Sequence, residues 1–195
     1  MKIFDISRPY FHTPVYPGDP VPSLSWLSRV EKGEGYNLSS FSGCVHTATH
    51  ADAPLHVWSE GQTIDKMPLE LFYGECFVVS ASGILTEDWV DQLMMGKKKR
   101  RVLIHGNQSS YLSEEAARLL AKTGIFLLGT DASSIGNGKS EYEVHRLLLS
   151  QGIAILEGLN LSQVTDGEYL LCAFPIKLDG AEGAPVRAVL VQNQP

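Results

Sequence analysis

The second half of the chain alternates between two hydrophobic patterns, and this alternation limits the fold more than any other feature of the sequence. Apolar runs of strand length are predicted at residues 76–82, 100–106, 124–132 and 152–159. Between them, apolar residues at helical spacing predict helices over 85–94, 112–124 and 140–152. Ser113 is a predicted N-cap, and Gly124 and Gly152 are predicted helix stops. Strands that alternate with helices indicate an α/β fold.

Short strand-like runs dominate the first half. They are predicted at residues 2–7, 23–30 and 37–45, and residues 31–37 supply the glycine and asparagine of a hairpin turn. Two further strands, 169–178 and 184–192, flank a turn-rich segment. Together the two halves predict a mixed, largely antiparallel sheet with flanking helices. We expect a single domain over residues 1–195, which is long enough to fold without a metal or disulfide staple.

The charge balance argues against nucleic acid and anionic membranes as partners. The formal net charge is -6 and the pI is near 5.5, whereas such partners require a basic surface. The basic run KKKRR at 97–101 lies between a predicted helix and an apolar strand, so we expect a solvated loop and strand edge there. A small molecule is therefore the expected partner.

Cysteine usage and hydropathy bear on the compartment. Cys44, Cys76 and Cys172 are odd in number and form no C-x-x-C pair, which favours a reducing cytoplasm. The segment MKIFDISRPY lacks the apolar core of a signal peptide, and no apolar run approaches the ~18 residues of a membrane span. We therefore expect a soluble cytoplasmic protein.

Residues 46–56, HTATHADAPLH, hold three of the six histidines in the chain. If residues 46–52 are extended, His46, Ala48, His50 and Asp52 project to the same side, and small Ala48 leaves space for an ion. A helix is the weaker interpretation, because it would turn Asp52 away and Pro54 would end it. Two imidazoles and a carboxylate suit zinc, manganese or cobalt. The alternative is that these histidines are hydrogen-bonded polar residues near a turn.

A second possible ligand, Glu157, interrupts the apolar run 152–159. A buried bare carboxylate is costly, so it needs a cation, a proton or several donors, unless it reaches solvent at the strand end. His145 borders the apolar face of the preceding predicted helix, and a helix-to-strand hairpin would bring it to Glu157. A histidine on the helix surface is the alternative.

The histidine segment resembles the H-x-G-T-H-x-D-x-P-x-H signature of the cyclase or kynurenine formamidase family of metal-dependent hydrolases. Supporting stretches include FDISRPY, PVYPGDP, LLGTDASS, ILEGLNL and FPIKLDGAEGAPVRAVL, so the likeness runs nearly end to end. The resemblance implies a swivelling β/β/α fold, a homodimer and two divalent ions, commonly zinc. The implied ligands are His46, His50 and Asp52 for the first ion, and Asp52, His145 and Glu157 for the second.

The resemblance also implies a reaction and further residue roles. His56 would be the catalytic acid/base that protonates the departing nitrogen of an aryl amide. The best-known substrate of the family is N-formyl-L-kynurenine, which gives L-kynurenine and formate in tryptophan breakdown. Tyr16 stands where family formamidases usually carry a tryptophan that contacts the aromatic substrate. Ala48 replaces the signature glycine, and His105 begins a segment where an arginine and threonine are expected.

Three other possibilities are weighed against this one. Because Tyr16 and His105 depart from the family pattern, hydrolysis of an isatin-type cyclic amide stays open. A non-catalytic metal-binding module would keep the ligands for stability alone, but His56 then has no evident purpose. A serine hydrolase is disfavoured, because the chain has no G-x-S-x-G elbow. Asp131 is either a partner of a ligand histidine or a helix cap.

Overall fold

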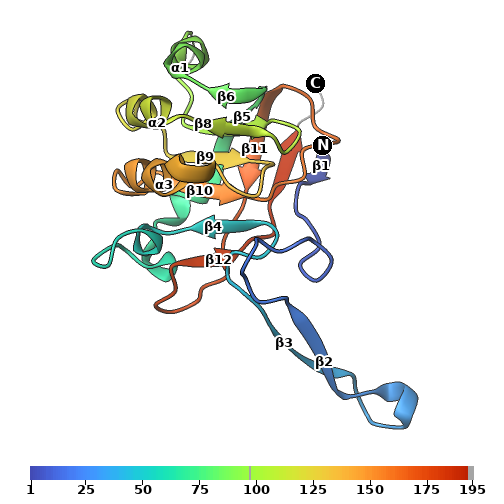
Figure 1. Ribbon diagram of the computed structural model, residues 1–195. Coiled ribbons are helices and arrows are strands. Elements are labelled where there is room, and N and C mark those ends of the chain that lie inside the picture. The colour runs from blue at the N-terminus through green and yellow to red at the C-terminus, as the bar shows by residue number, and fades with distance from the viewer. Residues whose placement is uncertain (97, 193–195) are drawn as a thin grey trace.

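The computed structural model describes residues 1–96 and 98–192, and a mixed nine-stranded sheet forms its centre (Figure 1). In order across the sheet, the strands are β1 (Lys2–Asp5), β13 (Val189–Gln192), β11 (Gly167–Cys172), β5 (Tyr73–Ser80), β7 (Arg101–His105), β9 (Leu127–Thr130), β10 (Ala154–Glu157), β4 (His50–Asp52) and β12 (Gly183–Pro185). The pairs within β5-β7-β9-β10 are parallel, and the other neighbouring pairs are antiparallel. The predicted mixed, largely antiparallel sheet is confirmed.

In the described part of the chain, the α-helices are α1 (Glu87–Met94), α2 (Glu114–Leu120) and α3 (Glu141–Leu149), and they cover one face of the sheet (Figure 1). Ser113 caps α2 as predicted, because its side chain accepts a hydrogen bond from the amide of Ala116. The helices end three or four residues before the predicted stops, Gly124 and Gly152. No helix among the described residues is long and apolar enough to cross a membrane.

The sheet separates two hydrophobic cores. Side chains alternate along each strand, so Val102 and Ile104 of β7 pack under the helices while Leu103 joins the core on the opposite face. Strand β10 divides in the same way, with Ile155 on the helix side and Leu156 on the other. Burial on both faces explains why these parallel strands read as continuous apolar runs in the sequence.

Short elements complete the fold. Strands β6 (Gly83–Leu85) and β8 (Ser110–Leu112) form a small parallel pair. The 3₁₀ turns are η1 (Val30–Lys32), η2 (Pro54–His56), η3 (Ile64–Lys66), η4 (Leu69–Phe72) and η5 (Gly138–Ser140). Of these, η2 matters for the site, because it turns the chain directly after β4 and places His56 at its end.

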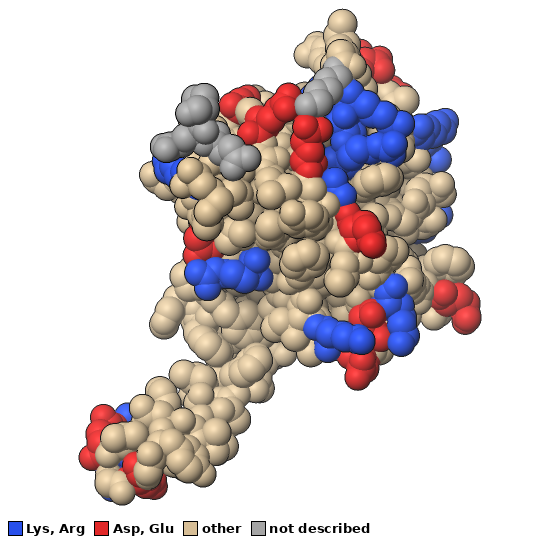
Figure 2. Space-filling model, turned by 180° about the vertical axis from the view of Figure 1, so that it is seen from behind, with Lys and Arg blue, Asp and Glu red and all other residues tan. Residues whose placement is uncertain are grey.

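A two-stranded arm projects from the body of the protein (Figure 1). It consists of the antiparallel strands β2 (Ser23–Ser28) and β3 (Leu38–Ser42), as the hairpin prediction required. Its stem carries exposed apolar side chains, among them Trp26, Leu27 and Phe41, and the sequence has no charged residue over 20–28 or 35–45. Figure 2 shows the same distribution, with charge confined to the tip of the arm.

Two local predictions are wrong. Residues 46–49 are a turn and not a strand: β4 begins only at His50, and Ala48 has φ 60, a left-handed conformation that interrupts extended backbone. The basic run is not wholly solvated. Lys97 lies outside the described residues, but Arg101 is buried, where its guanidinium donates hydrogen bonds to backbone carbonyls, those of Glu70, Leu71 and Glu75.

Candidate metal centre

Strand pairing brings the two halves of the site together. In the antiparallel ladder of β4 and β10, His50 stands directly opposite Glu157 and Asp52 opposite Ile155. Directly opposed residues share a face of the sheet, and Ile155 belongs to the helix-side core. His50, Asp52 and Glu157 therefore point toward the helices, where α3 presents His145. All four side chains are at least 95% buried.

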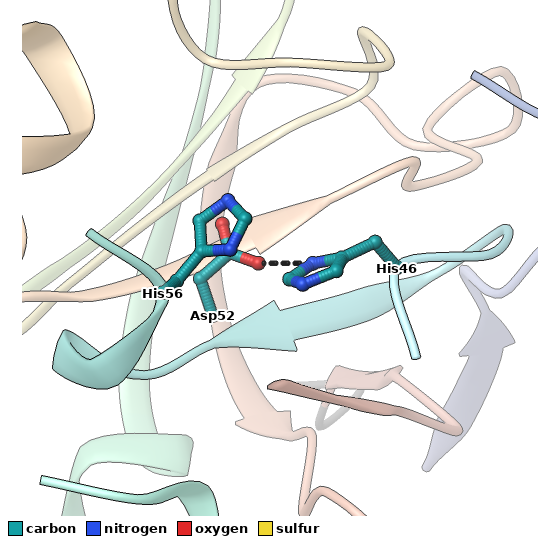
Figure 3. Close-up of side chains that lie close together, drawn as sticks. All are labelled: His46, Asp52 and His56. Carbon is teal, nitrogen blue, oxygen red and sulfur yellow. Dashed lines mark hydrogen bonds and ion pairs between the residues drawn. The ribbon is translucent and has the colours of Figure 1, made fainter. Parts of the chain in front are cut away.

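The side chains form a compact group of imidazoles around two carboxylates. Nε2 of His145 lies 3.0 Å from Oε1 of Glu157 and 3.6 Å from Oδ2 of Asp52. Nε2 of His50 lies 3.4 Å from Oδ1 of Asp52 and 3.5 Å from Oε2 of Glu157. From the turn before β4, His46 places Nδ1 2.9 Å from Oδ1 of Asp52 (Figure 3). Glu157 is buried, so a solvent-reaching glutamate is ruled out.

Backbone carbonyls orient two of the imidazoles. Nδ1 of His50 pairs with the carbonyl oxygen of Ala48 at 3.1 Å, and Nδ1 of His145 pairs with that of Glu141 at 2.8 Å. An imidazole that donates Nδ1–H to a carbonyl offers Nε2 as a ligand, which is the usual arrangement in protein metal sites. In both residues Nε2 faces the carboxylates.

The site contains buried polar atoms that have no hydrogen-bond partner. Nε2 of His46 and Oδ2 of Asp52 are both in this state, although unpaired buried polar atoms are costly. Possible ligand atoms of His50, Asp52 and Glu157 lie within 4.8 Å of one another, and so do those of His46, Asp52 and His56. The set contains nitrogen and oxygen donors and no thiolate, so it fits a divalent metal ion.

Electrostatic coupling within the cluster shifts the pKa values of its members. Burial lowers the pKa of His50, but hydrogen bonds to Asp52 and Glu157 outweigh burial and raise it well above its usual value. Burial also lowers the pKa of His145, but the charge and hydrogen bond of Glu157 outweigh burial and raise this pKa to about 9. Burial raises the pKa values of Asp52 and Glu157, but hydrogen bonds from the imidazoles and their charges outweigh burial. The pKa of Asp52 is held well below its usual value, and that of Glu157 is held below its usual value. Without a bound cation, protons on the imidazoles would balance the charge of the two carboxylates.

His56 differs from the other histidines because it is exposed at the end of η2. Its ring lies beside that of His46 (Figure 3), with the two centroids 4.2 Å apart. The centroid of the His145 ring is 5.8 Å away. Partial burial and the neighbouring imidazoles lower its pKa, against the opposing charge of Asp52. A neutral, accessible imidazole at the edge of the cluster is suited to accept a proton near pH 7.

Tyr16 lies beside α3, and its hydroxyl donates a hydrogen bond to Oε2 of Glu141 at 2.9 Å.

Sequence reasoning missed Glu182, whose Oε1 lies 3.5 Å from Nε2 of His46. No local signal marks Glu182, because only the pairing of β12 with β4 brings its loop to the site. Asp131 plays neither predicted role: its Oδ1 accepts hydrogen bonds from the amides of Gly106 and Gln108.

Comparisons with known proteins identify the family of the chain. The model of the Cyclase family matches residues 4–137. A kynurenine formamidase of Salinibacter ruber is 37% identical, with 97% of each chain covered. The chain belongs to the cyclase family. A solved structure of a potential metal-dependent hydrolase with cyclase activity is 31% identical, has a TM-score of 0.84 and covers 100% of this chain and 99% of that one.

The fold is also shared with solved structures at greater sequence distance. Isatin hydrolase A of Labrenzia aggregata has a TM-score of 0.84, 23% identity and coverage of 98% of this chain and 94% of that one, which speaks for the fold alone. The family model ends at residue 137, before His145 and Glu157. The nearly full-length matches extend the cyclase-family likeness over α3 and β10, where these two residues lie.

Proposed function

We propose that the protein is a metal-dependent amide hydrolase that converts N-formyl-L-kynurenine to L-kynurenine and formate, a step of tryptophan catabolism. One observation carries the proposal: a buried cluster of imidazoles and carboxylates, in which Nε2 of His46 and Oδ2 of Asp52 have no hydrogen-bond partner, lies beside the exposed imidazole of His56. The curated relative at 37% identity, named kynurenine formamidase, supports the choice of substrate.

The proposed cofactor is a pair of divalent ions, most simply zinc, with manganese or cobalt as alternatives. His46, His50 and Asp52 would hold one ion; Asp52, His145 and Glu157 would hold the other. Bound divalent ions lower the pKa of water and polarise a carbonyl group. Because two carboxylates face three imidazoles, Asp52 and Glu157 supply the negative charge that a cationic centre requires.

His56 is assigned the proton transfers. Its lowered pKa keeps the imidazole neutral at pH 7, so it can take up a proton and then deliver it to the departing aryl nitrogen. Protonation is needed because an unprotonated amine is a poor leaving group. Tyr16 is assigned to the aromatic part of the substrate: its ring is exposed beside α3, which carries His145.

Hydrolysis assays with N-formyl-L-kynurenine and isatin test the proposed function. We expect turnover of the formamide, and we expect Tyr16→Ala to raise KM more than it lowers kcat, because an aromatic contact binds ground and transition states alike. Turnover of isatin alone would replace the proposed substrate with a cyclic amide. A protein that binds zinc but hydrolyses neither compound would be a non-catalytic module.

We further propose that the working form is a cytoplasmic homodimer. An isolated two-stranded hairpin is only marginally stable in water, so the exposed apolar stem of the β2–β3 arm favours a partner. A groove of about 820 Å³ at the foot of the arm, lined in part by Phe11, Phe174 and Ile176, offers a second copy an apolar surface. Light scattering should give a dimer for the wild type and a monomer for the double variant Trp26→Ser, Leu27→Ser.

The proposed cytoplasmic location is supported by the three free cysteines, which fit a reducing compartment.

A further inference from the structure

A short N-terminal segment is tied to the helix that carries His145. Residues 16–19 form a turn in which the amide of Asp19 donates to the carbonyl of Tyr16 at 3.0 Å, and Gly18 has φ 101. From this turn the hydroxyl of Tyr16 reaches Oε2 of Glu141 at 2.9 Å. Glu141 is the first residue of α3, so the hydrogen bond joins segments 125 residues apart in the sequence.

The Tyr16–Glu141 pair stands at the edge of the metal centre. Glu141 and His145 are one helical turn apart on the same face of α3, and the carbonyl of Glu141 pairs with Nδ1 of His145 at 2.8 Å. The hydrogen bond to Glu141 is the main cause that raises the pKa of Tyr16, and the charge of Glu157 adds to it. The phenol is therefore within electrostatic reach of a carboxylate of the cluster.

The carboxylate of Glu141 has no basic partner among the described residues. It is hydrogen-bonded to a neutral phenol, and among the described residues no lysine or arginine forms an ion pair with it. Glu143 on the same helix differs, because both its oxygens accept hydrogen bonds from Arg146, at 2.7 and 2.5 Å. Glu141 is half-buried, so solvent screens its charge incompletely.

We infer that Glu141 is a specificity-determining residue that binds a cationic amine on the substrate, with Tyr16 as its positioning residue. The inference rests on the proposed function and deepens it. Kynurenine-type substrates carry an ammonium group at the end remote from the formamide, and Glu141 places a carboxylate one helical turn before the candidate ligand His145, at the edge of the metal centre. An ammonium also needs an anionic partner beside a centre that binds divalent cations.

Two substrates and a matched control variant test the role of Glu141. N-formyl-L-kynurenine carries the amine, whereas 2′-formamidoacetophenone has the same aryl formamide and ketone without it. Glu141→Gln keeps a hydrogen-bond acceptor for Tyr16 and removes the charge. We expect KM for formylkynurenine to rise about tenfold, and KM for the neutral formamide to change less than about twofold. Glu143→Gln, whose native partner is Arg146, should leave both values unchanged.

A binding measurement separates recognition from turnover. By calorimetry, Glu141→Gln should weaken the binding of L-kynurenine about tenfold and leave that of 2-aminoacetophenone unchanged. Tyr16→Phe should show the same selectivity in smaller measure, because the ring stays while the hydrogen bond to Glu141 is lost.

Three outcomes would overturn the inference. An equal rise in KM for both formamides, or no rise for either, would show that the Glu141 charge is not used for selection while leaving the proposed function intact. The same selective effect from Glu143→Gln would point to the general charge of α3. If the wild type hydrolyses neither formamide, the proposed function fails, and this inference fails with it.

Discussion

Removing the metal should make the stability of this protein fall as the pH rises from about 6.5 to about 9. The raised pKa values of two buried histidines, His50 and His145, cause this fall, and the share of His145 can be given a size. Burial lowers its pKa, but the charge and hydrogen bond of Glu157 and the charge of Asp52 overcome burial and raise the pKa to about 9. A group with a raised pKa stabilises the folded state while it is protonated. The stabilisation is therefore complete below the unfolded value, about 6.5, and is lost as the pH passes through about 9.

The expected size follows from the two pKa values. Each pH unit between about 6.5 and about 9 corresponds to about 1.4 kcal/mol, so His145 contributes about 3 kcal/mol to the free energy of unfolding in acid. Urea unfolding of chelator-treated protein at both pH values measures this loss. His145→Gln is the control, because glutamine cannot take up the proton. Equal losses in the wild type and the variant would refute the reasoning.

Metal binding offers a second way to measure the protonation of His145. His145 must lose it before Nε2 can bind an ion, so zinc affinity should increase with pH up to about 9. Calorimetric titration at pH 7.5 in two buffers of different ionisation enthalpy should show proton release, and His145→Gln should release fewer protons. Zinc binding without proton release would contradict the link between His145 and the metal.

The remaining predictions concern ligands and backbone. Elemental analysis of protein supplied with zinc should find close to two ions per chain, and less than about one would contradict the proposed site. Glu157→Gln should lose metal and activity together, whereas His56→Asn should keep its metal while kcat falls by roughly 10²–10⁴; metal loss in His56→Asn would make His56 a ligand. Gly158→Ala should cost more than about 2 kcal/mol in urea unfolding, since its Cβ would lie 2.2 Å from the carbonyl oxygen of Ala48. Gly152→Ala, at a similar positive φ with open space, should cost less; equal costs would remove the steric argument.

Local periodicity explains which parts of the fold and site were predictable. The two-residue period of a strand places His50 and Asp52 on one face, and the helical period places His145 at the buried side of α3. The turn that holds His46 was not predictable from such a pattern, because it depends on the left-handed Ala48.

Contacts that depend on the pairing of distant segments could not be predicted from the sequence either. Glu182 meets His46 because β12 pairs with β4. Arg101 is buried because its guanidinium donates to carbonyls of the distant 3₁₀ turn η4 and of strand β5. Neither pairing leaves a mark in the surrounding sequence. A charged residue beside an apolar run therefore reads as solvated until its partners are known.

The position of β4 in the sheet means that this strand can pair only with strands that follow it in the sequence. Its only neighbours among the described strands are β10 and β12, so His50 has no ladder partner until residues 154–157 and 183–185 have been synthesised. Metal binding to the histidine segment before these strands have paired would weaken the stabilisation that metal gives the native state. Because these pairings join residues far apart in the sequence, closure of the centre should be a late and slow folding event.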